Sequence, residues 1–192
     1  MKKVAIVINS AWQGYNFRLN LARALKINNY DVNFIAPNDD KYSNKLKKEF
    51  SFTNVDFQAD GLNPINDLRV CFSLFKAFKK IKPDIVLNFT IKPNIYSAIV
   101  AKSLGIHSIN NITGMGTAFV IKQTVITVIV KLLYKVSILF ASHVFFQNSD
   151  DKRYFVNSNL VSVDKCSIIP GSGVDTKKFI PEDFQNDEIF RF

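Results

Sequence analysis

The sequence is poor in the residues that form cross-links, metal sites and tight turns. Its 192 residues include two cysteines, two histidines, seven glycines and six prolines. Cys71 and Cys166 are isolated from each other, one in a predicted helix and one in a predicted strand. This spacing matches neither a metal site nor a disulfide framework, so a reducing compartment such as the cytosol is expected.

Long apolar runs are also missing. After Met1, Lys2 and Lys3, the first apolar stretch covers only 4–8, which is too short for the core of a signal peptide. A second stretch within 118–141 is interrupted by lysines and falls short of the roughly 20 residues that span a bilayer. Neither stretch is therefore expected to be a signal peptide or a membrane-spanning helix.

The composition that remains is hydrophobic and basic. Hydrophobic residues make up 47% of the chain and include 18 phenylalanines, which is enough to build a core and excludes a disordered chain. Lysine and arginine number 25 against 16 acidic residues, for a net charge of +9. This charge favours an anionic partner: a phosphorylated ligand, an acidic membrane surface or nucleic acid. A solvated lysine-rich surface explains the same excess on helix faces.

Strand-like and helix-like apolar patterns alternate along the chain. Short, mostly apolar runs predict strands at 4–8, 32–36, 85–89, 144–146 and 166–169. A weak strand at 55–57 and a strand at 107–112 complete the alternating pattern. Helical spacing predicts helices at 16–27, 41–50, 65–81, 95–104, 118–141 and 150–156, with Gly105 as a helix stop. In the helix at 65–81, the side chains expected to point inward are Leu68, Phe72, Phe75 and Phe78. The alternation predicts an α/β fold, a Rossmann-like doubly wound parallel sheet.

Ligands of such sheets bind at the carboxyl ends of the strands, so the loops after strands carry the candidate sites. The first loop, 9–16, contains Gly14 and Asn16, and Arg18 follows it. It is not a G-x-G-x-x-G loop, so a dinucleotide site is not supported. Gly14 and the free N–H groups of the next helix could approach a phosphate, and Arg18 could add a bidentate contact. A plain turn with a surface arginine fits the same residues.

The second loop, 88–94, follows a central strand with Thr90 and Lys92. A lysine at the strand end suits a phosphate or a sugar oxygen, although an ordinary solvated lysine is the simpler interpretation. Pro93 fits the first turn of a helix. The third loop, 110–117, has a density of polar residues that favours hydroxyl or phosphate binding over a simple helix-capping turn. Its candidate ligand-binding residues are Asn111, Thr113, Gly114, Gly116 and Thr117.

The last two loops have simpler explanations. In 147–151, Asn148 or Ser149 is interpreted first as a helix N-cap, although Asn148 would also face the cleft. In 170–175, Gly171 and Gly173 permit unusual backbone angles and Asp175 can hydrogen-bond the turn.

The loops at 88–94, 109–119, 144–151 and 168–175, in that order, resemble the amino-terminal half of a bacterial glycosyltransferase of family four. The resemblance covers nearly the whole chain. It is closest to capsule, O-antigen and protein-glycan assembly enzymes that act on polyprenyl-diphosphate-linked sugars. It implies one half of a GT-B architecture, in which the amino-terminal domain binds the acceptor and the carboxyl-terminal domain holds most of the nucleotide-sugar.

The resemblance also implies roles for residues. The Gly14 loop, with Asn16 and Arg18, would lie near the donor diphosphate and acceptor, and the loop from Asn111 to Thr117 near the acceptor. Thr90 and Lys92 would lie near the transferred sugar as catalytic residues. The segment from Gly171 to Asp175 would form the turn before the hinge.

The implied reaction retains anomeric configuration and uses a UDP-linked sugar, with an N-acetylhexosamine as one candidate. It needs no cofactor or metal, in agreement with the absence of an Asp-x-Asp motif. Many relatives have a histidine after the fourth strand. This chain has Asn88, Phe89 and Thr90 there, and its two histidines are predicted at strand starts, so a histidine-assisted step is not expected.

The domain expectation follows from the same resemblance. Residues 1–180 are expected to form the acceptor-binding domain, and 181–192 a linker and the start of a missing donor-binding domain. Without the donor-binding domain, the chain is expected to be inactive. One alternative is a non-catalytic, membrane-recruiting subunit that pairs with a separate donor-binding chain. A single-domain nucleotide or nucleic-acid binder is a third, but no nucleic-acid motif is present. The expected location is the cytoplasm, at the inner face of the cytoplasmic membrane.

The helix predicted at 118–141 bears on membrane contact. A polar stripe is formed by Gln123, Thr127, Lys131 and Lys135, joined by Thr124, and apolar residues cover the rest of the helix. Packing of the helix on the sheet is the simpler interpretation. In the alternative interpretation, part of the apolar surface of this helix lies on an anionic membrane, and the basic helix at 65–82 adds positive charge to the same membrane-binding patch.

Overall fold

The protein is a single parallel sheet covered by helices on both faces. The computed structural model describes residues 1–57, 63–115, 125–176 and 179–180. The seven strands lie in the order β3-β2-β1-β4-β5-β6-β7, and each neighbouring pair is parallel. Their bounds are β1 (Lys2–Val7), β2 (Tyr30–Ala36), β3 (Ser51–Asn54), β4 (Ile85–Phe89), β5 (His107–Ile112), β6 (His143–Phe146) and β7 (Cys166–Ile168). The doubly wound, Rossmann-like prediction is confirmed.

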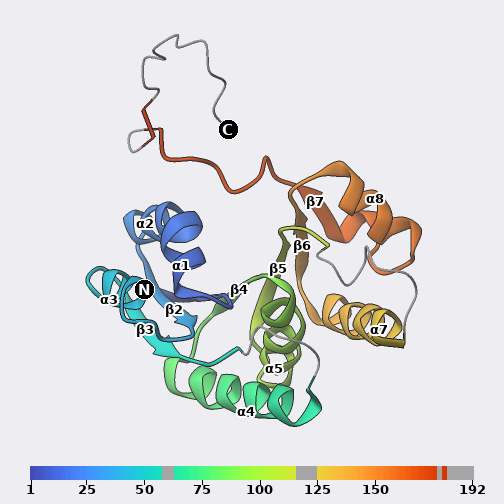
Figure 1. The fold of residues 1–192 in the computed structure, drawn as a ribbon, viewed down its shortest axis with the longest axis horizontal. Coiled ribbons are helices and arrows are strands. Elements are labelled where there is room, and N and C mark those ends of the chain that lie inside the picture. Colours follow the sequence, from blue (N-terminus) through green and yellow to red (C-terminus); the bar gives the residue numbers. More distant parts are fainter. Residues whose placement is uncertain (58–62, 116–124, 177–178, 181–192) are drawn as a thin grey trace, which may run out of the picture.

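The helices divide between the two faces of the sheet (Figure 1). One face is covered by α1 (Ala11–Gln13), the π-helix η1 (Gly14–Arg18), α2 (Leu19–Ile27) and α3 (Tyr42–Lys47). The other is covered by α4 (Pro64–Ile81), the π-helix η2 (Pro93–Ser97), α5 (Ala98–Ser103), α7 (Val125–Phe140) and α8 (Ser149–Asn157). A short 3-10 turn, η3 (Val163–Lys165), precedes β7.

Local capping explains where several helices begin and end. The side chain of Asn63 accepts hydrogen bonds from the backbone N–H groups of Ile65 and Asn66, and Pro64 occupies the first turn, where its missing N–H costs nothing. At the other end of α4, Lys82 adopts a left-handed conformation and Pro83 follows. Gly105 ends α5 with a φ of 70°, as predicted.

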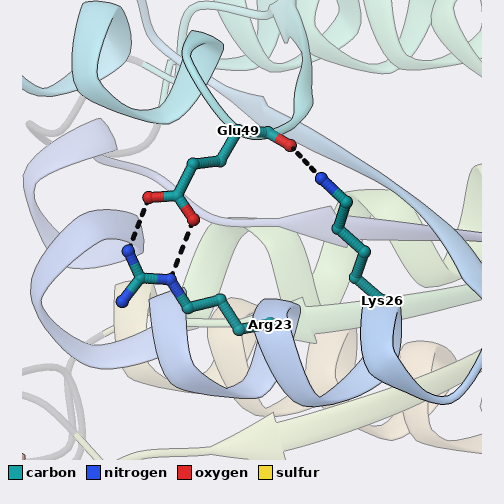
Figure 2. Close-up of polar contacts among 3 residues, drawn as sticks. All are labelled: Arg23, Lys26 and Glu49. Atoms are coloured by element: carbon teal, nitrogen blue, oxygen red, sulfur yellow. Dashed lines mark hydrogen bonds and ion pairs between the residues drawn. The ribbon is translucent and has the colours of Figure 1, made fainter.

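An exposed ion pair joins α2 to the end of α3. Figure 2 shows the guanidinium of Arg23 donating to both carboxylate oxygens of Glu49, at 2.8 and 2.5 Å, and Lys26 donating to the Glu49 carbonyl at 3.0 Å. The bidentate geometry holds the pKa of the Glu49 carboxyl below its usual range. Because both side chains are more than a third exposed, the pair contributes at most about 1 kcal/mol.

Two predicted boundaries are wrong. The loop expected over 9–15 is helical from Ala11, because Ala11 and Gly14 pack toward the buried side chains of β2 and α3. No strand is assigned at 55–57; the strand lies immediately before this segment, at β3 (Ser51–Asn54). Val55 and Phe57 are buried as expected, but only Val55 extends the ladder, with one hydrogen bond to the Ala36 carbonyl.

The predicted inward face of α4 is half wrong. Phe78 is buried and Phe75 is partly buried, but Leu68 and Phe72 are 70% and 60% exposed. Val70 and Leu74 take the buried positions instead. Apolar residues occur around most of this helix, so periodicity alone leaves its rotation about its axis open.

The polar stripe expected on α7 does not form one solvent-facing surface. Thr127 is buried, whereas Lys135 is exposed and Lys131 is intermediate. The interpretation of this segment as a core helix is confirmed: α7 packs against α5 and η2, and its Val130, Tyr134 and Ile138 belong to the same core cluster as the strand residues Val144 and Phe146. The described helix begins at Val125, so the expected segment 118–124, with Gln123 and Thr124, lies outside the described residues, as does 181–192.

Candidate functional site

The carboxyl ends of β1 and β4 meet at the switch point of the sheet. The chain winds outward from β1 through β2 to β3, then returns to place β4 on the other side of β1. Ligands of doubly wound sheets bind in the crevice at such a point. Each of these two strands is followed by a π-helix, η1 after β1 and η2 after β4. Because π-turns are rare and concentrate at functional sites, this edge is the first candidate.

Arg18, the last residue of η1, is a buried cation at this edge. Its side chain is buried, with only 6% of the residue exposed, and its guanidinium lies 4.2 Å from the centre of the Phe89 ring of β4. Its Nη1 donates to the hydroxyl of Ser172 at 3.0 Å, whereas Nε has no partner in the described chain. Burial lowers the pKa of Arg18 to about 10, so it remains charged at neutral pH.

No carboxylate of the described residues lies within ion-pair distance of Arg18. A buried charge without a partner is unfavourable, because neither water nor a counter-ion replaces its hydration. An anionic ligand in contact with the Arg18 guanidinium would supply the missing counter-charge.

The hydroxyl of Ser172 joins Arg18 to the ends of two more strands. Gln147, directly after β6, donates from Nε2 to Ser172 at 3.1 Å and to the Asn111 side-chain oxygen at 3.4 Å. Asn111 belongs to β5 and is buried. Arg18, Ser172, Gln147 and Asn111 thus form a polar chain along the carboxyl edge from η1 to the segment after β7. This segment runs back from β7 toward α2 (Figure 1).

A cavity of about 980 Å³ opens beside this polar chain. This volume is at the upper end of the range for small-molecule sites. Its walls are largely apolar and aromatic, and Trp12 and Phe17 form an edge-to-face pair with ring centres 5.5 Å apart. The apolar wall consists mainly of Trp12, Phe17, Leu19, Leu21, Leu87, Phe89, Ile109, Phe145, Ile169, Val174 and Phe179. Polar groups enter through Asn16, Arg18, Asn20, Arg23, Asn111, Ser172 and Asp175. Such a cavity can hold an amphipathic anion.

Thr90, directly after β4, has a strained backbone and an unsatisfied hydroxyl. Its φ is 71°, in the left-handed region that β-branched residues rarely adopt. Its Oγ1 is buried without a hydrogen-bond partner in the described chain. Its carbonyl accepts from the backbone N–H of Asn94 at 3.0 Å, which ties the bend to η2. Strain and a buried hydroxyl without a partner among the described residues make Thr90 a candidate functional residue.

Lys92 does not point into the cavity but pairs with α4. Its Nζ lies 3.2 Å from the carboxylate of Asp67, and the two side chains are 15% and 10% exposed. Tyr96 completes the cluster: burial first, and then its hydrogen bond to Asp67, raises the pKa of the Tyr96 phenol. An ordinary solvated lysine, the simpler interpretation of the sequence, is therefore wrong.

Buried asparagines hold η2 against the sheet. Asn88 donates to the side chain of Asn110 at 2.9 Å, and Asn110 donates to the carbonyl of Asn94 at 3.0 Å. Asn94 donates in turn to the carbonyl of Asn111 at 2.9 Å. The first three side chains are fully buried. This network gives the loop after β4 a rigid base.

The predicted site residues divide into three groups. The cavity is lined by Asn16, Arg18, Asn111, Gly171, Gly173 and Asp175. The described residues that do not line it are Gly14, Thr90, Lys92, Thr113, Gly114 and Asn148. Gly116 and Thr117 lie outside the described residues.

Two members of the second group have clear local roles. The side chain of Asn148 caps α8 by accepting from the Asp151 N–H at 2.7 Å, which confirms the capping interpretation. Gly14 is buried, and a Cβ there would contact Leu46 and Phe34 at 3.4 and 3.6 Å.

Sequence reasoning missed Ser172 and Gln147 as site residues, together with the aromatic wall of Trp12 and Phe17. Ser172 and Gln147 do stand in loops after strands, which is the signal that could have identified them. Trp12 carries the same signal, since it stands in the loop after the first strand, whereas Phe17 had none because it fell in the helix predicted at 16–27.

Groups for metal binding or membrane spanning are not found in the described ranges. No three His, Cys, Asp or Glu side chains there are arranged to hold a metal ion. None of the described helices combines the length and the apolar composition needed to cross a bilayer. His107 and His143 begin β5 and β6, at the opposite edge from the cavity, as predicted.

Comparisons with known proteins agree with this fold. Residues 3–148 match the family described as "Glycosyl transferase 4-like". The chain is 28% identical over 172 residues to the N,N'-diacetylbacillosaminyl-diphospho-undecaprenol alpha-1,3-N-acetylgalactosaminyltransferase of Campylobacter jejuni, covering 87% of the chain and 45% of that enzyme. It is 29% identical over 156 residues to the UDP-Gal:alpha-D-GlcNAc-diphosphoundecaprenol alpha-1,3-galactosyltransferase of Escherichia coli, covering 79% of the chain and 39% of that enzyme.

Among solved structures, a glycosyltransferase from Rickettsia africae superimposes with a TM-score of 0.66 at 18% identity, covering 96% of this chain and 46% of that one. The fold is that of one Rossmann-like half of a GT-B architecture. The chain spans about half the length of the relatives that it matches.

Proposed function

The chain belongs to the glycosyl transferase 4-like family, and from this premise we propose that it is the acceptor-binding half of a retaining glycosyltransferase. The reaction moves a sugar from a nucleotide-sugar to a polyprenyl-diphosphate-linked glycan in surface-glycan assembly. The names of both relatives specify a diphospho-undecaprenol acceptor, which supports this substrate class. Because the chain spans about half of each relative, the donor-binding half is proposed to lie in a further domain or a separate chain.

The buried charge of Arg18 is the observation that carries the proposal. A diphosphate is the anion that nucleotide-sugars and lipid-linked acceptors share, and a guanidinium binds phosphate oxygens in bidentate geometry. Arg18 lies at the carboxyl edge with a free Nε and no carboxylate partner among the described residues. The apolar wall beside it suits the first part of a prenyl chain or a sugar face, and it excludes water from the phosphate contact.

The other polar residues then have separate tasks. Gln147 and Asn111 orient the Ser172 hydroxyl that positions Arg18. Thr90 and Lys92 lie at the end of β4, where we place the transferred sugar. A substrate oxygen that reached the buried Thr90 hydroxyl would give it the hydrogen-bond partner that it lacks among the described residues. The bond between the anomeric carbon and the donor diphosphate breaks with its electron pair moving to the diphosphate, whose charge a nearby cation stabilises. An acceptor hydroxyl oxygen forms the new bond to the anomeric carbon, and its proton passes to the departing diphosphate. No metal or cofactor is assigned to this step.

The test is to measure by calorimetry how a short-chain polyprenyl-diphosphate-linked sugar binds to the purified chain in detergent. We expect binding that requires the diphosphate and weakens about 100-fold in Arg18→Met, since one desolvated charge contact contributes about 3 kcal/mol. Arg153→Met, at an exposed arginine that does not line the cavity, is the matched control and should bind as the unchanged chain does.

Two outcomes would contradict the proposal. Equal binding of the diphosphate and of the uncharged polyprenol would remove the role of Arg18. Robust transfer from a UDP-sugar by the chain alone would contradict its assignment as the acceptor-binding half, because the proposal expects only background transfer without a donor-binding partner.

A further inference from the structure

The exposed face of α4 carries three large apolar side chains. Ile65, Leu68 and Phe72 are 65%, 70% and 60% exposed, in the first half of the helix. Positions spaced by three, four and seven residues share one face of a helix, so the three form one patch rather than scattered surface residues. Single exposed leucines are ordinary on soluble proteins, but a contiguous apolar patch marks a contact surface.

The same face is cationic and carries no acidic residue. Its exposed basic side chains are Arg69, Lys76, Lys79 and Lys80. The Lys76 ammonium lies 4.3 Å from the centre of the Phe72 ring, which mixes charge and apolar surface directly. Asp67 is the one acidic residue of α4, and it points inward to Lys92. The helix is therefore amphipathic in an unusual sense: its exposed side is apolar and positively charged.

The fold places the start of this helix at the carboxyl edge of the sheet, on the face opposite the helices that line the cavity. The chain enters α4 after β3, so its first turn lies at the carboxyl edge of the sheet. The ion pair between Asp67 and Lys92 fixes that turn to the loop after β4, two residues from Thr90. Ile65 and Leu68 flank Asp67 in sequence, so the apolar patch lies at the site end of the helix and the cations extend along it.

We infer that this face of α4 docks on the surface of an anionic lipid bilayer, with Ile65, Leu68 and Phe72 in the interface and the basic side chains against lipid phosphates. Exposed apolar residues flanked by lysine and arginine have the chemistry of an interfacial helix. The inference rests on the proposed function, because a polyprenyl-linked acceptor must be taken from a membrane. It adds which surface faces the lipid and hence how the site is presented to it.

Cosedimentation with vesicles tests this docking. The full chain should bind vesicles of phosphatidylcholine with about 30% phosphatidylglycerol far more tightly than phosphatidylcholine alone, and salt should weaken binding by screening. Leu68→Ser/Phe72→Ser should weaken binding at least about tenfold, because apolar surface no longer enters the interface. Ile27→Ser/Val163→Ser, at equally exposed apolar positions on other elements, should bind as the unchanged chain does.

A second pair of variants separates local charge from net charge. Lys76→Gln/Lys79→Gln should bind about tenfold less well, whereas Lys41→Gln/Lys48→Gln, which removes the same charge from the α3 region, should change binding less than about twofold. All substitutions lie at exposed positions, and thermal unfolding monitors the fold.

Equal losses in both lysine pairs would overturn the inference in favour of non-specific attraction. No vesicle binding at all would also overturn it, in favour of a protein partner for this face. The acceptor-binding proposal and the membrane-docking proposal are distinguished by measuring how Leu68→Ser/Phe72→Ser binds the acceptor analogue in detergent. The cavity does not include α4, so this binding should not depend on the docking surface. If detergent binding persists while the vesicle result fails, the proposed function stands without the docking surface.

Discussion

The Arg18 guanidinium donates a 3.0 Å hydrogen bond to the hydroxyl of Ser172, which lies 154 positions further along the chain. The contact joins the helix after the first strand to the segment after the last one. It leaves the guanidinium charge without a carboxylate in the described chain. A hydroxyl orients a guanidinium but does not neutralise its charge, so the Arg18 guanidinium is positioned to bind an anionic ligand. The first prediction follows from this combination.

Replacing Arg18 by methionine should keep or raise the stability of the ligand-free chain. The pKa falls from 12.5 to about 10 through burial, and this shift corresponds to a penalty of about 3 kcal/mol. Loss of the Ser172 hydrogen bond and the Phe89 contact offsets about 2 kcal/mol of it. Urea unfolding should therefore show a change between zero and about 1 kcal/mol in favour of Arg18→Met.

Arg23→Met is the comparison for that measurement, because Arg23 lines the same cavity but is paired with Glu49. It should lose at most about 1 kcal/mol. Destabilisation of Arg18→Met by more than about 2 kcal/mol would instead identify Arg18 as a structural residue.

The ion pair between Asp67 and Lys92 should show strong coupling in a double-mutant cycle. Lys92→Met leaves a carboxylate that is only 10% exposed without its cation and should cost about 3 kcal/mol, and Asp67→Asn should cost a similar amount. The double variant should lose less than the sum of the two, since neither charge is then unpaired. Additive losses in chemical denaturation would mean that the pair contributes no interaction energy.

Thr90→Gly should be more stable than Thr90→Ala by about 0.5–1 kcal/mol. Both remove the unpaired hydroxyl, but only glycine adopts a φ of 71° without steric cost. Comparing the stabilities of these two variants separates the effect of backbone strain from the effect of the buried hydroxyl. Both variants should bind or transfer sugar less well if the Thr90 hydroxyl contacts substrate, whereas equal stability of the two would show that the bend is not strained.

Stability should fall as the pH rises from about 9 to 11, in part through Cys71. Burial first, and then the charge of Asp67, raises the pKa of the Cys71 thiol from 9.0 to about 11. A pKa that is higher in the folded state favours the protonated thiol, so its contribution is complete below pH 9 and is lost as the pH passes 11. Thermal melts of Cys71→Ala should decline less steeply than those of the unchanged chain, by about 1–2 kcal/mol over this interval. Parallel curves would exclude the thiol as a source.

Periodicity was informative for strands and less so for the faces of helices. The mostly apolar run at 85–89 coincides with β4, because a central strand covered on both faces is rich in apolar residues. In α4, apolar residues surround the helix, and the Asp67–Lys92 pair accompanies a rotation that buries Val70 and Leu74 and exposes Leu68. That pair joins residues 25 positions apart, so no local pattern contains it.

The location of the site was predicted from the sequence, but the contacts within it were not. Arg18 and Asn111 were expected at the carboxyl edge, since loops after parallel strands meet there. Their connection through Gln147 and Ser172 depends on how four chain segments converge. So does the difference between Arg23, which pairs with a carboxylate, and Arg18, which has no carboxylate partner among the described residues.

The sequence by itself determined the α/β class, the order of strands and helices along the chain, and the loops that reach the site. These properties follow from apolar spacing, turn residues and the rules of parallel connections, all of which act over short stretches. Only the tertiary structure decided that Arg18 is buried without a counter-charge from the described residues, that Lys92 is neutralised by Asp67, and that Leu68 and Phe72 face outward. Burial and charge pairing depend on residues distant in the chain, and these terms decide what each side chain can bind.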